Sequence, residues 1–140
     1  MILKIKKIHL DAKIPSYAHH DDAGFDLYST ENVLLKRGTR FAVPTGITMA
    51  IPEGYVGLIW DKSGLAVNHG IKTIGGVIDS TYRGEILVGV INFGEKDYLF
   101  EKGHKVAQMI IQKKETVDFE EVEELNETKR GKGNFGSTGK

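Results

Sequence analysis

Hydrophobic and polar residues alternate over many short stretches of this chain, while the three-to-four-residue spacing of a helix is rare. Pro44 and Pro52 fall at the ends of such stretches, where a missing backbone N–H costs a strand little. A single short helical turn is predicted around residues 63–67. The predicted strands cover residues 3–10, 24–29, 40–43, 46–51, 55–60, 85–93 and 105–112.

Many short strands separated by Gly- and Pro-containing turns are typical of a sandwich, a jelly roll or a barrel, so an all-β fold is predicted. The 140 residues suffice for one domain with a hydrophobic core. We expect residues 1–125 to form the β-barrel and residues 126–140 to form a C-terminal arm. The acidic residues between 115 and 127 fit a solvated strand and linker, or a charge that extends the arm away from its own anion site.

Composition limits the possible partners. The chain has no cysteine, which excludes disulfides, thiolate metal sites and Cys nucleophiles. Its formal net charge is zero. No apolar run approaches the roughly 20 residues of a membrane span, and the N-terminus lacks a secretory pattern. We therefore expect a cytoplasmic protein that binds neither membranes nor a nucleic acid polymer, and any polyanionic ligand must be small and held locally.

The last eleven residues combine four glycines and three cations with a single aromatic residue, Phe135. Such a segment cannot repay its ordering entropy from its own contacts. Arg130 and the hydroxyls of Ser137 and Thr138 can donate to phosphates, and glycines such as Gly136 expose backbone N–H groups. The tail is therefore predicted to be a flexible arm that orders over a ligand with phosphates and a flat ring.

The densest polar segment, residues 75–85, is predicted to be a β-hairpin. Gly75 and Gly76 allow a ligand close to the backbone. Asp79 follows an apolar pair, so we expect it half-buried and suited to activate a water. Tyr82 offers a flat ring. The alternative is a hairpin with a turn Asp and a packing Tyr.

Three further positions carry candidate chemistry. Lys62, Ser63 and Gly64 combine a cation, a hydroxyl and free backbone N–H groups in a small anion site, unless Asp61 or Ser63 simply caps a helix. Asp26 faces opposite to its apolar neighbours and could support a hydrated Mg²⁺, or it is a solvent-facing acid. Gln108 stands alone among apolar residues, so its amide must find backbone or ligand partners.

These segments, in this order, resemble the five motifs of the trimeric, all-β dUTPase family. The resemblance covers residues 23–139. It implies a jelly-roll-like barrel that hydrolyses dUTP to dUMP and pyrophosphate with Mg²⁺, as a homotrimer with shared active sites. The five segments are residues 23–27, 62–66, 76–84, 103–108 and 130–139.

The resemblance also implies a role for each site residue. Asp79 would be the general base that orients water toward the α-phosphorus, and Tyr82 would lie under the deoxyribose. Asp26 would act on the metal through water. The uracil would be read by the backbone of Gly76, Val77 and Ile78 with Thr73 nearby, the phosphates would be held by Lys62, Ser63, Gly64 and Gln108, and the tail would close over the substrate with Arg130, Phe135, Gly136, Ser137 and Thr138.

Two alternatives stay open. A dCTP deaminase shares a similar fold but carries a catalytic Glu ten residues beyond the Asp that matches Asp79, where this chain has Gly89. The other is a non-catalytic nucleotide-binding module. The chain departs from the usual motifs at Lys62, where Arg is usual, at Asn134, where Gly is common, and at His104, where Asp is common.

Overall fold

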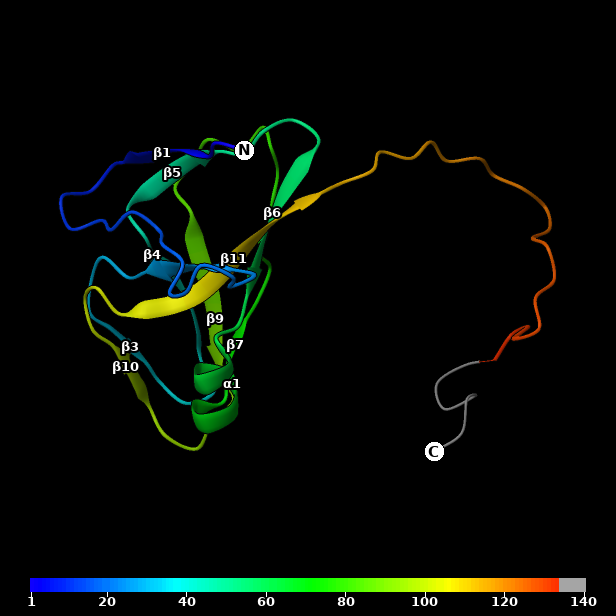
Figure 1. Cartoon of the computed structure of the whole chain (residues 1–140). Helices are drawn as coiled ribbons and strands as arrows, with labels where there is room; N and C mark the ends of the chain where they lie inside the picture. The colour runs from blue at the N-terminus through cyan, green and yellow to red at the C-terminus, as the bar shows by residue number, and fades with distance from the viewer. Residues whose placement is uncertain (134–140) are drawn as a thin grey trace.

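The fold is seen in a computed structural model, which describes residues 1–133. Strands form the body of the protein, with one short helix at one end of it (Figure 1). The elements are β1 (Lys4–Lys7), β2 (Phe25–Tyr28), β3 (Val33–Leu35), β4 (Arg40–Pro44), β5 (Ile47–Ala50), β6 (Tyr55–Trp60), α1 (Ser63–His69), β7 (Ile71–Thr73), β8 (Val77–Ile78), β9 (Leu87–Asn92), β10 (Tyr98–Phe100) and β11 (Lys105–Lys113).

The strands pair in four small sheets, all of them antiparallel. The largest has the order β2-β11-β6-β8, and a second has the order β4-β9-β7, with the pairs β1-β5 and β3-β10 completing the body. The core is aliphatic and aromatic, with Leu27, Val88, Val90 and Phe100 fully buried. The predicted all-β fold is confirmed.

The segment of residues 75–85 is not the hairpin that we predicted. In a hairpin the two arms pair with each other, whereas Ile78 pairs with Gly57 of β6, and β9 pairs with β4 and β7. The short strands β3, β7 and β10 were not predicted because three residues are too few to show a period of two. Strand β1 covers only residues 4–7 of the predicted 3–10.

Asn92 is a buried polar residue that joins the end of β9 to its surroundings. Its Nδ2 donates to the carbonyls of Leu35, at 3.0 Å, and Lys96, at 2.9 Å. Its Oδ1 accepts from the N–H of Gly94 at 2.8 Å. One side chain therefore satisfies three backbone groups that would otherwise be buried without partners.

Beyond β11 the chain leaves the body. The N–H of Lys114 still donates to the carbonyl of Gly54, at 2.9 Å. Residues 115–133 contain no strand, and Phe119 and Leu125 are 95% and 84% exposed. This segment runs away from the sheets (Figure 1). The boundary at residue 125 stays a prediction.

No helix in residues 1–133 has the length and apolar character needed to cross a membrane.

Replacing Asn92 by Ala should destabilise the fold strongly. The change leaves two carbonyls and one N–H without their side-chain partner, and each unsatisfied buried group costs about 1–3 kcal/mol. We expect the free energy of unfolding in urea to fall by about 3 kcal/mol or more. Asn68→Ala, at an exposed position of α1, is the matched control and should change it little. Equal effects of the two variants would contradict this role of Asn92.

Candidate functional site

A buried carboxylate lies where β2, β11 and the end of β6 meet. Asp26 is only 3% exposed, although the sequence left open that it faces solvent. The Nζ of Lys62 lies 2.5 Å from its Oδ1, and the Nζ of Lys105 lies 2.6 Å from its Oδ2. Each ammonium group is therefore paired with a different oxygen of one carboxylate: Lys62 hydrogen-bonds Oδ1, whereas Lys105 forms an ion pair with Oδ2 that lacks the geometry of a hydrogen bond.

The two lysines set the ionisation of Asp26. Burial disfavours the charged carboxylate, but the contacts and charges of Lys105 and Lys62 outweigh this effect and lower the pKa of Asp26 below its usual value. The ion pair with Asp26 raises the pKa of Lys105. One carboxylate between two lysines gives the cluster a net formal charge of about +1.

Gln108 joins the same cluster from β11. It pairs with Asp26 on one side and with Trp60 on the other. Its Nε2 donates to the carbonyl of Asp61 at 2.9 Å. A Cβ on Gly24 would lie 2.9 Å from the Gln108 Oε1, so glycine at position 24 makes room for this amide. The amide thus has the backbone partner that was one of the two predicted possibilities.

Asp61 fastens the loop before α1 to β7. Its Oδ1 accepts from the N–H of Thr73 at 2.6 Å and from the Thr73 hydroxyl at 2.7 Å. The Nζ of Lys72 lies 2.6 Å from its Oδ2. Burial opposes ionisation here too, but these bonds lower the pKa of Asp61. Thr73 was expected near the uracil, and its hydroxyl donates to Asp61 instead.

The start of α1 has no side-chain cap. Lys62 occupies the N-cap position without a capping hydrogen bond, and Asp61 is directed to β7 instead. Ser63 and Gly64 are exposed in the first turn. The helix-cap alternative is therefore wrong, and the N–H groups of this turn are available to an anion.

Four of the other predicted site residues line a cavity away from this cluster. It has a volume of about 150 Å³ and is lined by Val77, Ile78, Asp79, Tyr82, Glu85 and Leu87. The turn is closed by the N–H of Tyr82, which donates to the Asp79 carbonyl at 3.1 Å. Asp79 is exposed, not half-buried as expected, because it lies in this turn beyond the end of β8.

Two glycines shape this cavity. The Tyr82 hydroxyl donates to the Glu85 carbonyl at 3.0 Å, and a Cβ on Gly84 would lie 2.3 Å from that hydroxyl oxygen. Gly84 is therefore what lets the ring lie across the turn. Gly76 has a φ of +98°, which favours glycine, and its carbonyl accepts from the N–H of Ile59 at 2.8 Å.

The cluster at Asp26 and the cavity at Asp79 lie at opposite ends of β6. Ile78 pairs with Gly57, so Asp79 lies level with the start of β6, whereas Gln108 pairs with Trp60 at its end. With a rise of about 3.3 Å per residue, four residues separate these levels by about 13 Å. One chain thus carries two separate candidate half-sites.

A divalent metal would find few protein ligands here. Residues 1–133 hold no cluster of three His, Asp or Glu side chains that could bind an ion. Both oxygens of Asp26 contact lysines. These residues fit an ion that arrives on the phosphates of a ligand, with Asp26 reaching it only through water.

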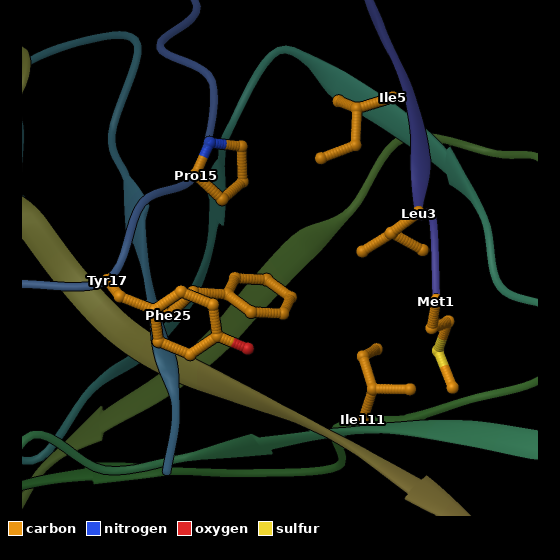
Figure 2. Close-up of a pocket in the computed structure, with 7 residues that line it drawn as sticks. All are labelled: Met1, Leu3, Ile5, Pro15, Tyr17, Phe25 and Ile111. Atoms are coloured by element: carbon orange, nitrogen blue, oxygen red, sulfur yellow. The ribbon is translucent and has the colours of Figure 1, made fainter. Parts of the chain in front are cut away.

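A larger apolar cavity lies elsewhere on the body. Figure 2 shows Met1, Leu3 and Ile5 facing Phe25 and Ile111, with Pro15 and Tyr17 at the side. Its volume is about 360 Å³. Its lining contains no charged side chain, so it does not suit a triphosphate.

Comparison with known proteins agrees with the motifs. The sequence matches the family model for dUTPase over residues 11–139. The deoxyuridine 5'-triphosphate nucleotidohydrolase of Clostridium tetani is 49% identical over 99% of this chain and 97% of that protein. The protein of the same name from Clostridium kluyveri is 48% identical over 99% of both chains. The chain belongs to the dUTPase family.

Solved structures of dUTPases share the fold. A mutant dUTPase of the staphylococcal bacteriophage 80alpha superposes with a TM-score of 0.90, at 28% identity, over 97% of this chain and 98% of that one. The dUTPase of that phage with dUpNHpp gives 0.89, at 28% identity, over 99% and 98%. A mutant dUTPase from phage phi11, described with a structural Mg(II) ion, gives 0.82, at 27% identity, over 89% and 98%.

The arm residues are only partly placed. The Nε of Arg130 donates to the carbonyl of Gly133 at 3.3 Å, within the arm itself. Phe135, Gly136, Ser137 and Thr138 lie outside the described residues, so their roles stay predictions.

Sequence reasoning missed Lys105, because strand alternation places it on the opposite face from Gln108.

The lowered pKa of Asp26 makes a prediction about acid stability. Its ion pairs stabilise the fold above about pH 4, and this contribution is lost as the pH falls through the folded-state pKa. In urea unfolding, the stability gap between the wild type and Asp26→Asn should narrow from about pH 6 to about pH 3.

Asp21→Asn is the matched control, because the Asp21 side chain is 99% exposed. It should show almost no gap at any pH. A gap for Asp26→Asn that stayed constant over the same range would show that the ion pairs are not the source of the stability.

Proposed function

We propose that this protein hydrolyses dUTP to dUMP and pyrophosphate. The proposal rests chiefly on one observation: Asp79, Tyr82, Val77 and Ile78 line one cavity in a chain of the dUTPase family. Solved structures of related phage dUTPases contain the dUTP analogue dUpNHpp. The residues of the cavity have the chemistry that water attack on a nucleotide phosphate requires.

In the proposed reaction Asp79 is the general base. It is exposed at the turn, where its carboxylate can accept a proton from a water aligned with the α-phosphorus. The water oxygen bonds to that phosphorus, the bond to the bridging oxygen of the β-phosphate breaks, and pyrophosphate leaves. Most of the rate gain comes from positioning and charge stabilisation, as is usual for phosphoryl chemistry.

The cavity selects the nucleoside part of the substrate. Tyr82 is held by the Glu85 carbonyl and by the absence of a side chain at Gly84, so its ring is a rigid floor for the deoxyribose. Such a floor leaves no room for a 2′-hydroxyl. Strand β8 lies at the edge of its sheet, so backbone groups of Val77 and Ile78 that do not pair with β6 would read the uracil edge, with Gly76 leaving room beside them.

The cluster at Asp26 supplies the charge for the phosphates. We assign Lys62, Ser63, Gly64 and Gln108 to phosphate binding, and the net charge of about +1 around Asp26 supports this. Mg²⁺ arriving with the triphosphate would neutralise further charge, and Asp26 would act on it through water. Arg130 and the tail residues beyond 133 would complete the site.

The two half-sites support an active site shared between chains. The step of about 13 Å along β6 is longer than the span from an α- to a γ-phosphate, which favours Asp79 and Lys62 of different chains serving one substrate. A homotrimer with shared active sites brings half-sites of different chains together. Exposed apolar side chains on β4, β8 and β9 and in the loop after β7 support such assembly: Phe41, Val77, Leu87 and Ile74.

A deaminase activity is disfavoured by Gly89. A Cβ at this position would lie 2.7 Å from the Ile74 carbonyl oxygen, so a catalytic Glu could not occupy it without moving β9 or the loop after β7. A non-catalytic binding module is disfavoured by Asp79, because a module that only binds has no need for a base there.

Replacing Asp79 by Asn should abolish turnover and spare binding. The amide keeps the size of the side chain but cannot accept the proton, so we expect kcat to fall by about 10²-fold or more. The Kd of dUpNHpp should change by less than about threefold, since the Asp79 carboxylate contacts the attacking water and not the nucleotide. Pyrophosphate release and calorimetry measure the two. Full turnover in Asp79→Asn would exclude this mechanism.

Mixing two inactive variants tests the shared site. Asp79→Asn and Lys62→Ala should each be inactive alone. When they are unfolded, mixed in equal amounts and refolded together, a site regains both native residues with a chance of about one quarter in a cyclic trimer. Recovery of about a quarter of wild-type pyrophosphate release is expected. If each chain had a complete site of its own, mixing would restore nothing.

A further inference from the structure

A β-bulge in β11 changes the face on which Lys105 lies. Ala107 pairs with Leu27 and Gln108 with Asp26, but the next residue of β2, Tyr28, pairs with Lys105. Two steps on β11 therefore oppose one step on β2. The bulge reverses the alternation, and Lys105 reaches the face of Asp26 and Gln108.

On this face a partly exposed lysine contacts a buried carboxylate. The Lys105 Nζ lies 2.6 Å from Oδ2 of Asp26, and the Lys62 Nζ lies 2.5 Å from Oδ1. The Asp26 side chain is 4% exposed, whereas that of Lys105 is 45% exposed. The bulge therefore delivers a surface lysine to one oxygen of a buried carboxylate.

An ammonium group has three N–H donors, and a carboxylate can engage two of them when both of its oxygens are free. With Oδ2 occupied by Lys105, Asp26 contacts Lys62 through Oδ1. Lys62 then keeps donors for another anion.

We propose that Lys105 is a positioning residue of the phosphate site: by occupying Oδ2 of Asp26, it leaves Lys62 free to donate to the nucleotide phosphates. This inference rests on the proposed function, since it needs a phosphate ligand at Lys62. Lys105 acts through Asp26 and does not itself touch the substrate. Without Lys105, Asp26 would hold Lys62 with both oxygens.

A double-mutant cycle tests this role. Calorimetry with dUpNHpp and Mg²⁺ should show that Lys105→Met raises the Kd about tenfold, the value of one charge-assisted hydrogen bond. In turnover, KM should rise while kcat changes little. In an Asp26→Asn background, adding Lys105→Met should change the Kd by less than about twofold, because the residue through which Lys105 acts has lost its charge.

Two controls separate this effect from a change of fold. Lys105→Arg keeps a cation on Oδ2 and should bind dUpNHpp like the wild type. Lys102→Met removes a lysine from the turn just before β11, where its Nζ lies 3.1 Å from Oδ2 of Asp11, and should leave the Kd unchanged. The Tm of each variant shows whether an affinity loss follows unfolding.

The outcomes are distinguishable. If the wild type does not bind dUpNHpp, the proposed function fails and this inference with it. If the wild type binds and Lys105→Met binds equally well, only the role of Lys105 fails. If Lys105→Met weakens binding equally in both backgrounds, Lys105 contacts the phosphates itself, and the positioning role is overturned.

Discussion

The ion pairs of the buried Asp26 carboxylate with Lys62 and Lys105 are the interaction on which the proposed phosphate site depends. An isolated ionised carboxylate in the interior would cost several kcal/mol, and the two lysines offset this cost. They come from different segments, Lys62 from the loop after β6 and Lys105 from β11. One ion-pair cluster therefore ties β2, β11 and the start of α1 together and fixes where the cations lie.

Two glycines leave space for the polar side chains of the cluster and of the cavity. Gly24 leaves space for the Gln108 amide, and Gly84 leaves space for the Tyr82 ring. Asp61 holds the loop before α1 onto β7 through Thr73, so the first turn of the helix has no side-chain cap of its own. The polar groups are thus oriented by neighbours from other strands before a ligand arrives, which is the condition for electrostatic preorganisation.

The cavity at Asp79 and the cluster at Asp26 lie at opposite ends of β6. The cavity follows β8, which pairs with the start of β6, and the cluster adjoins its end. Antiparallel pairing holds the two apart within one chain, which is why the proposed reaction is assigned to a site shared between chains. Association between chains is the simplest way to bring base and phosphates together, and the exposed apolar residues of β4, β8 and β9 are consistent with it.

The sequence by itself determined the strand-rich fold, the helical turn after residue 62 and the segments that carry polar chemistry, because alternation and turn residues are local signals. It could not show that Val77 and Ile78 pair with β6, that Asp79 is exposed, or that Asp26 is buried between two lysines. Those facts depend on which strands become neighbours. The bulge at Lys105 is the clearest case: one extra residue reverses the face of a side chain, and only the pairing with β2 reveals it.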